Sequence, residues 1–398
     1  MNSSQASVPP AGARLVAVQL AGSAALAAFD DVWSTGAAVL PVDPHADPAA
    51  AHAAAVALGA AEIIAGATTS SLPDATPVPA GTALVVRTSG TTGAPRGVVL
   101  RHDALRATVA ASLRRLACEP GDRWLCVLPL QHVAGVLVAL RARALGAEPI
   151  IHPGFDVDAI TAETAATHVA LVPTMLHRLL DHGVDLSRYR RILLGGAAAT
   201  PGLLERARAA GALVTTTYGM TETAGGCVYD GVPLDGVAAA VDPDGRLLLR
   251  GPVLADGYRN GRVLEPLTTD GWLRTNDLGR WGDDGRLVVT GRADDVVVTG
   301  GVNVSTTAVA AVLQDHAAVA EAAVVGVEDP EWGHQLVAYV VPIDPARPPS
   351  LEQLRAFVRA RSEPAHAPRD VVIVAALPRT TLGKIDRGAL VDTRPPAR

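Results

Sequence analysis

The sequence predicts an α/β protein with a large layered N-terminal domain, a small distorted β-barrel subdomain and a small α+β C-terminal domain. Short apolar runs alternate with helix-like periodicity over the first half of the chain, which is typical of layered α/β folds. Asp-Gly pairs at 244–245 and 284–285, each flanked by apolar residues, predict the hairpins of the barrel. The 398 residues suffice for two domains with large cores, which we place at 1–293 and 294–398.

The elements follow in chain order. Arg14 precedes the apolar run 15–28, which we interpret as an amphipathic first helix rather than a signal peptide, because polar residues interrupt it. Asp103 is expected to cap the helix 104–117, and Pro201 to lie in the first turn of another helix. The predicted strands are 84–88, 124–128, 169–172, 191–194, 322–327 and 336–342, and the predicted helices are 104–117, 134–145, 173–180, 201–210, 305–313 and 351–360.

The composition excludes several classes of protein. Apolar residues make up 49% of the chain and aromatic residues 3%, and the net charge is −6, which argues against disorder and against nucleic-acid binding. Apolar stretches such as 133–140 are too short to span a membrane. The cysteines Cys118, Cys126 and Cys227 are widely spaced and match no disulfide or metal pattern. We therefore expect a cytoplasmic protein.

Lysine occurs once, at Lys384, while the other 33 basic residues are arginine. Such a bias replaces lysine wherever arginine can serve, so the position that kept lysine needs a compact, rotatable charge rather than a planar guanidinium. This observation marks Lys384 as a candidate catalytic residue.

The segment R-T-S-G-T-T-G-A-P-R-G-V at 87–98 combines four hydroxyl side chains with three glycines. Glycines let the backbone approach a ligand closely, and successive amides in such a loop form an anion-binding nest. The segment is not a Walker A loop, because it lacks the Lys-Ser/Thr ending of that motif. It therefore predicts a phosphate-binding loop of another kind.

This loop and five further motifs resemble those of the adenylate-forming superfamily, which includes acyl- and aryl-CoA ligases, luciferases and peptide-synthetase adenylation domains. The further motifs occur in the family's order, and Lys384 falls on the family's catalytic lysine. They are L-P-L-Q-H-V-A-G at 128–135, Y-G-M-T-E-T at 218–223, T-N-D-L-G at 275–279, G-R-A-D-D at 291–295 and L-P-R-T-T-L-G-K-I-D-R at 377–387.

The resemblance implies a two-step ligase that uses ATP, Mg²⁺ and coenzyme A. A carboxylate attacks the α-phosphate of ATP to give an acyl-adenylate and pyrophosphate, and a thiol then displaces AMP. The ammonium group of Lys384 would bridge the carboxylate and the α-phosphate oxygens, which is the charge neutralisation that the displacement requires. Glu222 would be the magnesium ligand, since a carboxylate is a hard oxygen donor.

The resemblance also assigns roles to matching residues. His132 would gate the carboxylate pocket, and Asp294 would be the hinge between adenylation and thiolation poses. Independently of the resemblance, we interpret Cys227 as a small residue near the acyl pocket rather than a nucleophile, because no histidine lies close to it in the sequence. The ATP-phosphate set is Thr88, Ser89, Gly90, Thr91, Thr92, Gly93, Arg96 and Thr221. The adenine and ribose set is Gly196, Ala197, Tyr218, Gly219, Asp277 and Arg292, and Gly195 lies directly before this set in the chain. Gly225 and Gly226 would belong to the acyl pocket. Gly300 and Gly301, in the loop 299–303, would line the coenzyme A tunnel.

Three features resemble the short actinobacterial 2-succinylbenzoate–CoA ligases of menaquinone synthesis. The phosphate loop begins early in the chain, near residue 88, and the segments 225–236 and 33–44 match that group. The chain departs from the superfamily pattern at Arg96, where lysine is usual, at Val298, near a frequent lysine, and at Gln131, where an aromatic residue often precedes the histidine. The first 80 residues match weakly.

Two other functions stay open at this point. One is an aryl- or short-chain acyl-CoA ligase, or a free-standing adenylation domain that loads a carrier protein. The other is a nucleotide-binding protein without catalysis, which the presence of Lys384, Glu222 and Asp277 disfavours. The expected partners are an aromatic carboxylate, ATP and coenzyme A, with no nucleic acid and no membrane span, and a homodimer is left open.

Overall fold

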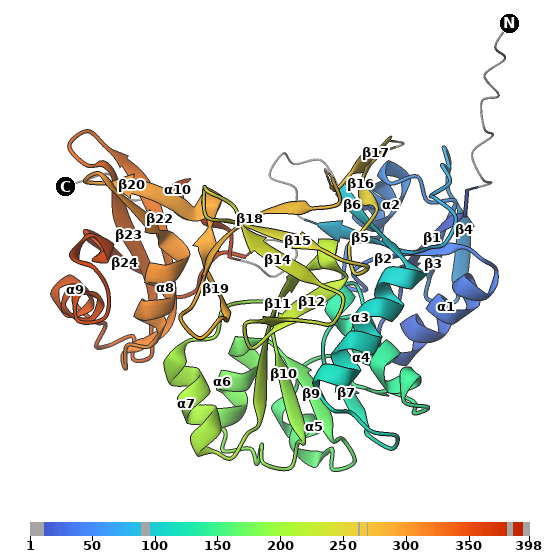
Figure 1. Cartoon of the computed structure of the whole chain (residues 1–398), viewed down its shortest axis with the longest axis horizontal. Coiled ribbons are helices and arrows are strands. Elements are labelled where there is room, and N and C mark those ends of the chain that lie inside the picture. Colours follow the sequence, from blue (N-terminus) through green and yellow to red (C-terminus); the bar gives the residue numbers. More distant parts are fainter. Residues whose placement is uncertain (1–11, 89–95, 262, 269, 380–384, 393–398) are drawn as a thin grey trace, which may run out of the picture. The chain divides into compact units, whose positions relative to one another are not determined.

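A computed structural model describes residues 12–88, 96–261, 263–268, 270–379 and 385–392 (Figure 1). The chain forms two compact units. The first comprises Met1–Ala197, Ala207–Ala239 and Leu249–Leu273, and the second comprises Ala198–Arg206, Ala240–Leu248 and Arg274–Arg398. The domain boundary predicted at residue 294 stays a prediction.

The first unit contains an eight-stranded sheet in the order β17-β16-β6-β5-β2-β1-β3-β4. The pairs β1–β2, β1–β3 and β2–β5 are parallel, and the outer pairs are antiparallel. The strands are β1 (Leu15–Gln19), β2 (Ala38–Pro41), β3 (Glu62–Ala65), β4 (Thr68–Ser71), β5 (Thr82–Thr88), β6 (Arg96–Arg101), β16 (Gly257–Asn260) and β17 (Val263–Pro266).

The predicted first helix is wrong over its first part. Leu15–Gln19 is the interior strand β1, and the helix α1 spans Gly22–Ser34. Leu15, Val16, Ala17 and Val18 are all at most 1% exposed, so this strand is covered on both faces. A strand buried on both faces is continuously apolar, and its sequence cannot be distinguished from a buried helical segment by periodicity.

The second sheet of this unit has the order β13-β12-β11-β10-β9-β7-β8. Strands β8, β7, β9, β10 and β11 are mutually parallel, whereas β12 and β13 are antiparallel additions at one edge. The strands are β7 (Trp124–Cys126), β8 (Ile150–Ile151), β9 (His168–Leu171), β10 (Arg191–Leu194), β11 (Val214–Met220), β12 (Gly225–Tyr229) and β13 (Val232–Pro233).

Helices α1, α3 (His102–Arg115) and α4 (Val133–Ala144) lie between these two sheets, as Figure 1 shows for α3 and α4. One apolar cluster joins Val39 and Leu84 of the first sheet, Phe29 and Leu137 of the helices and Trp124 of the second sheet. A second cluster covers the opposite face of the first sheet with α2 (Pro48–Ala57). The remaining helices in this part of the chain are α5 (Val157–Ala162), α6 (Pro173–Asp181) and α7 (Pro201–Ala209).

Most predicted helices and strands are confirmed to within a few residues, and the strand at 191–194 has the predicted bounds. The cap predicted at Asp103 is wrong. Helix α3 begins at His102 with Arg101 as its N-cap, and Asp103 lies in the first turn, where its carboxylate accepts a hydrogen bond from Arg106. An acid in the first turn still stabilises the helix through the macrodipole.

Two further sheets have most of their residues in the second unit. One has the order β14-β15-β18-β19, and its β18–β19 hairpin turns at the predicted Asp284–Gly285 pair. The other has the order β21-β20-β23-β22 with β24 beside β23, and it packs against α8 and α9. The strands are β14 (Ala238–Val241), β15 (Arg246–Arg250), β18 (Leu273–Trp281), β19 (Leu287–Arg292), β20 (Val296–Thr299), β21 (Val302–Ser305), β22 (Val319–Asp329), β23 (Gly333–Pro342) and β24 (Asp370–Ile373); the helices are α8 (Thr306–Gln314), α9 (Leu351–Arg359) and α10 (Arg387–Asp392).

Short 3₁₀ turns occur at Thr221–Thr223 (η1), Ala293–Asp295 (η2) and Pro364–His366 (η3). Over the described part of the chain, every helix is too short or too polar to cross a bilayer.

Candidate active site

The predicted phosphate loop connects two antiparallel strands. Thr88 at the end of β5 pairs with Arg96 at the start of β6, and both are half-buried. The other predicted loop residues, Ser89, Gly90, Thr91, Thr92 and Gly93, lie outside the described residues. The sequence analysis predicted no strand between this loop and the helix at 104–117, whereas the structure places strand β6 there, directly before α3.

Strands β11 and β12 form a tight turn around η1 that gathers much of the predicted nucleotide site. A Cβ on Gly219 would lie 2.1 Å from the Gly225 carbonyl oxygen, and a Cβ on Gly225 would lie 2.4 Å from Leu137 Cδ1. Thr223 Oγ1 accepts from the Met220 amide and donates to the Gly225 carbonyl at 2.7 Å. Glycine is therefore required at both positions, and the turn brings together the predicted Tyr218, Gly219, Thr221, Glu222, Gly225 and Gly226.

The carboxyl end of β10 lies beside the same turn, because β10 and β11 are parallel neighbours. A Cβ on Gly195 would lie 2.3 Å from Thr217 Oγ1, so a larger residue there would displace the Thr217 hydroxyl. Gly196 has φ +80°, a backbone conformation that favours glycine. Gly196 and Ala197 are both exposed and stand next to the strand that carries Tyr218. The structure thus groups these predicted adenine-binding residues.

Glu222 is half-buried and is hydrogen bonded to a residue that no sequence motif indicated. The Tyr258 hydroxyl donates to Glu222 Oε1 at 2.7 Å. The guanidinium carbon of Arg96 lies 4.2 Å from the centre of the Tyr258 ring, and Arg96 Nη2 is 2.9 Å from Glu265 Oε2. A carboxylate held by one hydroxyl donor is a hard oxygen ligand of the kind that Mg²⁺ prefers, so Glu222 fits the predicted metal role.

His132 lies at the junction of β7 and α4. It is the N-cap residue of α4, with an extended backbone, and its carbonyl accepts from the Gly135 amide at 3.1 Å. A Cβ on Gly135 would lie 2.4 Å from the Pro129 carbonyl oxygen, so the L-P-L-Q-H-V-A-G segment needs glycine where the helix begins.

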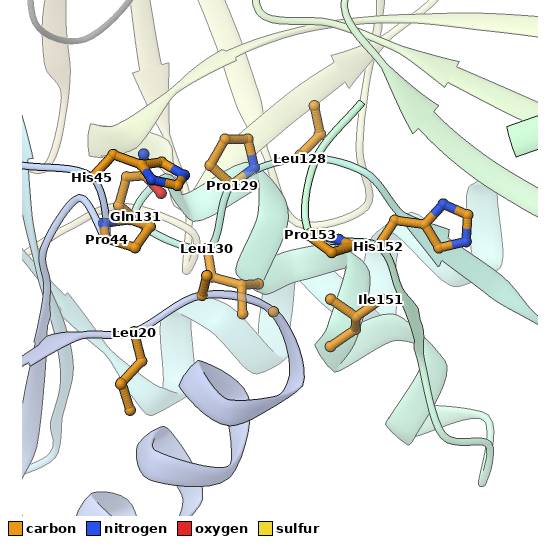
Figure 2. Close-up of a pocket in the computed structure, with 12 residues that line it drawn as sticks. Leu20, Pro44, His45, Leu128, Pro129, Leu130, Gln131, Ile151, His152 and Pro153 are labelled. Carbon is orange, nitrogen blue, oxygen red and sulfur yellow. The ribbon is translucent and has the colours of Figure 1, made fainter. Parts of the chain in front are cut away.

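A small hollow adjoins the residue before this histidine. Its volume of about 70 Å³ is far below the roughly 300–1,000 Å³ of typical ligand pockets, so it is too small for a nucleotide. Figure 2 shows His45 and Gln131 gathered at one end, while the ring of His152 projects away from them. The hollow lies where the chain leaves β1, β7 and β8; its lining is Leu20, Ala21, Gly22, Pro44, His45, Leu128, Pro129, Leu130, Gln131, Ile151, His152 and Pro153.

In the second unit, two of the predicted ribose-binding residues face each other. Asp277 on β18 pairs with Arg292 on β19, and Arg292 Nη1 lies 3.4 Å from Asp277 Oδ1. Arg292 also donates to both oxygens of Asp294, at 2.9 and 2.8 Å. The Arg292 side chain lowers the pKa of the Asp294 carboxyl, mainly through these hydrogen bonds. One guanidinium therefore links the predicted ribose acid to the predicted hinge acid.

The predicted coenzyme A tunnel residues form the tip of a hairpin. Thr299 pairs with Val302, so of the predicted loop 299–303 only Gly300 and Gly301 lie outside the strands β20 and β21. Their φ angles are +57° and +80°, which matches a two-residue turn that needs positive φ at both positions. The Gly300 amide donates to the Trp332 carbonyl at 2.9 Å. Lys384 lies outside the described residues.

A group of possible metal ligands lies elsewhere in the first unit. Cys118, Asp122 and His168 offer ligand atoms that all lie within 4.8 Å of one another, although their spacing in the sequence matches no metal pattern. Cys118 Sγ is 3.6 Å from His168 Nε2, and Asp122 accepts from Arg190 at 3.0 Å and from the Glu119 amide at 2.8 Å. Because a guanidinium already neutralises the carboxylate, we interpret the group as a hydrogen-bond network.

Comparisons with known proteins identify relatives of this chain. The family model described as "AMP-binding enzyme" matches residues 45–259, and the one described as "AMP-binding enzyme C-terminal domain" matches residues 308–384. A Mycobacterium tuberculosis protein named "Probable 2-succinylbenzoate–CoA ligase" is 42% identical over 322 residues, which are 78% of this chain and 84% of that protein. A Listeria monocytogenes 2-succinylbenzoate–CoA ligase is 32% identical, over 78% of this chain and 69% of that protein.

Among solved structures, an o-succinylbenzoate CoA synthetase from Bacillus subtilis, in complex with the acyl-adenylate intermediate, is similar with a TM-score of 0.86. It is 26% identical, and the match covers 97% of this chain and 89% of that one. The similarity extends over both units of the present chain.

Proposed function

Because this chain belongs to the AMP-binding enzyme family, we propose that it is a 2-succinylbenzoate–CoA ligase. It is an AMP-forming acid–thiol ligase that takes ATP and coenzyme A as substrates. Its product is a thioester on the route to menaquinone. We also propose a cytoplasmic location, where ATP and coenzyme A are available.

The observation that carries the choice of acid is the 42% identity to the mycobacterial relative, which extends over most of both chains. The choice of acid is also supported by the similar solved structure of an o-succinylbenzoate CoA synthetase in complex with its acyl-adenylate intermediate. The general ligase chemistry rests on a broader basis, because six ordered motifs and both family models support it.

The reaction proceeds in two displacements. A carboxylate oxygen of the acid forms a bond to the α-phosphorus of ATP, the bond to the bridging oxygen breaks, and pyrophosphate leaves with the bonding electrons. The thiol sulfur of coenzyme A then attacks the acyl carbon, the thiol proton passes to solvent, and the carbon–oxygen bond to AMP breaks. In the first step, charge must be neutralised on both the nucleophile and the phosphate.

Residues of the first unit bind and orient the triphosphate. The amides and hydroxyls of the loop that begins at Thr88 donate hydrogen bonds to the phosphate oxygens, and Arg96 at its far end supplies a positive charge. Glu222 would hold Mg²⁺, which neutralises phosphate charge when bound. Tyr218 stacks on adenine, next to Gly196 and the close-packed β10–β11 edge. His132 gates the carboxylate pocket.

Residues of the second unit contribute the remaining groups. Asp277 accepts hydrogen bonds from both ribose hydroxyls, because an ionised carboxylate offers two acceptor oxygens, and Arg292 orients it. Asp294 is the hinge at which the C-terminal domain, residues 294–398, turns between the two half-reactions. The Gly300–Gly301 turn lines the path of the thiol, and Lys384 bridges the carboxylate and the α-phosphate during adenylation.

The test is acid-dependent pyrophosphate release with ATP, Mg²⁺ and coenzyme A across 2-succinylbenzoate, substituted benzoates and short fatty acids. We expect selective turnover of 2-succinylbenzoate and a CoA thioester as the product. Activity on simple acids alone would keep the ligase chemistry and reject this acid. Pyrophosphate release without thioester formation would favour an adenylation domain that loads a carrier protein, and no release with any acid would favour a protein without catalysis.

A further inference from the structure

Tyr258 contacts two residues of the proposed ATP site at once. Its hydroxyl donates to Glu222 Oε1 at 2.7 Å, and its ring lies against the Arg96 guanidinium, with 4.2 Å from the guanidinium carbon to the ring centre. Tyr258 itself belongs to none of the six motifs on which the family assignment rests. All three residues belong to the first unit.

The pairing of β16 explains why this side chain points toward the site. Strand β16 is antiparallel to β6, the strand that leaves the phosphate loop, and Tyr258 pairs with Val98. Arg96 is two residues before Val98 and therefore lies on the same face of the sheet, within diagonal reach of the tyrosine ring. The contact between Tyr258 and Arg96 thus follows from the register of the sheet.

The next residue, Arg259, fixes this strand from the opposite face. Arg259 is 3% exposed and donates to three backbone carbonyls: Leu58 at 2.6 Å, Thr76 at 2.7 Å and Pro77 at 3.1 Å. Successive side chains of a strand point to opposite faces, so the anchoring of Arg259 holds Tyr258 toward Glu222.

We infer that Tyr258 is a positioning residue for the ATP–Mg²⁺ complex, an inference that rests on the proposed function. Its hydroxyl fixes the rotamer of the Glu222 carboxylate and so determines which oxygen faces the ion. Its ring holds the Arg96 guanidinium through a cation–π contact beside the phosphate loop. The residue acts through these two groups.

The Tyr258→Phe variant separates the two contacts, since it removes the hydroxyl and keeps the ring. Loss of a hydrogen bond to a metal-binding carboxylate commonly costs about 10-fold or more in metal affinity. We therefore expect the variant to need about 10-fold more Mg²⁺ for half-maximal ATP binding by titration calorimetry. ATP binding in the presence of EDTA should stay at the wild-type level, because the ring still supports Arg96.

A Tyr258→Leu variant removes both contacts, so we expect it to lose metal-free ATP affinity as well. In a Glu222→Gln background, Tyr258→Phe should change the Mg²⁺ requirement no further, since the two residues act through one hydrogen bond. Tyr189→Phe is the matched control: that buried hydroxyl accepts from Arg188 at 2.9 Å, and its loss should leave the Mg²⁺ requirement unchanged.

An unchanged Mg²⁺ requirement in Tyr258→Phe, or equal losses with and without Mg²⁺, would overturn the inference. Binding of ATP and Mg²⁺ requires no acid, so a wrong assignment of the acid leaves this test intact. Conversely, turnover of 2-succinylbenzoate by the wild type with no effect of the substitution would reject the role of Tyr258 alone.

Discussion

Arg292 and Asp277 face each other across the paired strands β18 and β19, with the guanidinium Nη1 3.4 Å from the carboxylate Oδ1. Asp277 is only 9% exposed, and its backbone amide donates to Thr275 Oγ1 at 3.1 Å. Arg292 also bonds both oxygens of Asp294, so its guanidinium is held from two sides. A carboxylate fixed in this way is oriented before it meets a ligand.

We predict that Asp277→Asn weakens ATP binding by about 10-fold or more, because an amide offers one acceptor oxygen where the carboxylate offers two charged ones. Titration calorimetry with ATP checks this. Asp284→Asn is the control, since Asp284 is an exposed turn residue of the same β18–β19 hairpin. Equal ATP affinities in wild type and Asp277→Asn would contradict the ribose-binding role.

The ion pair of Asp294 predicts a pH dependence of stability. Hydrogen bonds from Arg292 lower the pKa of Asp294 below its ordinary value of 3.8. The contribution of the ionised Asp294 carboxylate to the stability of the folded protein is therefore fully present above pH 3.8. It is lost as the pH falls through the lower pKa of the folded state. Since the pair is largely exposed, we expect Asp294→Asn to lower the free energy of unfolding by at most about 1 kcal/mol at pH 7.

Urea unfolding of wild type and Asp294→Asn between pH 7 and pH 3 measures this difference. The difference in free energy of unfolding between the two proteins should be constant near neutral pH and should decrease in acid. It should also decrease in high salt, because salt screens exposed charges. A gap that grows as the pH falls would have the wrong sign for this ion pair.

We predict that Glu265 competes with phosphate for Arg96, because the two side chains form an ion pair. Arg96 Nη2 lies 2.9 Å from Glu265 Oε2, and both side chains are partly exposed, so the pair contributes up to about 1 kcal/mol. Glu265→Gln should therefore tighten pyrophosphate binding by up to about 5-fold in calorimetry. Asp235→Asn, which removes the exposed partner of Arg114, is the control and should leave pyrophosphate affinity unchanged. Weaker binding in Glu265→Gln would mean that Glu265 supports the guanidinium instead.

Cys227 should resist alkylation in the folded protein. Burial raises the pKa of its thiol from 9.0 to about 12, and the residue is 0% exposed. The nucleophile is the thiolate, whose fraction at neutral pH falls about 1000-fold with that shift. Mass spectrometry after iodoacetamide treatment at pH 7.5 should find Cys227 modified far faster in urea than in the native state. Rapid native labelling would instead identify Cys227 as a reactive thiol.

Local patterns predicted those elements whose cause is local. The two Asp-Gly pairs predicted hairpin turns, and the positive φ angles of Gly300 and Gly301 account for the Gly-Gly pair between β20 and β21. Motif spacing grouped Tyr218, Glu222 and Gly225 because they lie on one short turn of chain.

Relationships between distant segments were not predictable in this way. Tyr258 reaches Glu222 across 36 residues, and Cys118 reaches His168 across 50. Strand β6 was missed because it is defined by its pairing with β5 and β16 rather than by its own short sequence. Strand β1 was misread because a strand covered on both faces has no alternation to reveal it.

Lys384 provides the sharpest test of the chemistry. We predict that Lys384→Ala lowers acid-dependent ATP–pyrophosphate exchange by about 100-fold or more, the usual cost of a lost transition-state contact to developing charge. The same variant should still convert a synthetic acyl-adenylate to the thioester, because the proposed role of Lys384 is confined to adenylation. Lys384→Arg should also fail in adenylation, since a planar guanidinium cannot replace a compact ammonium between two anionic groups.

Arg379 supplies the control for this prediction. It precedes Lys384 in the same motif and pairs with Glu321 at 2.9 Å within the second unit, so Arg379→Ala removes a nearby positive charge that has no assigned role in the reaction. That variant should retain both half-reactions. Equal loss of both half-reactions in Lys384→Ala would contradict a role confined to adenylation. A near-normal rate in Lys384→Arg would show that the single lysine of this arginine-rich chain was not kept for its shape.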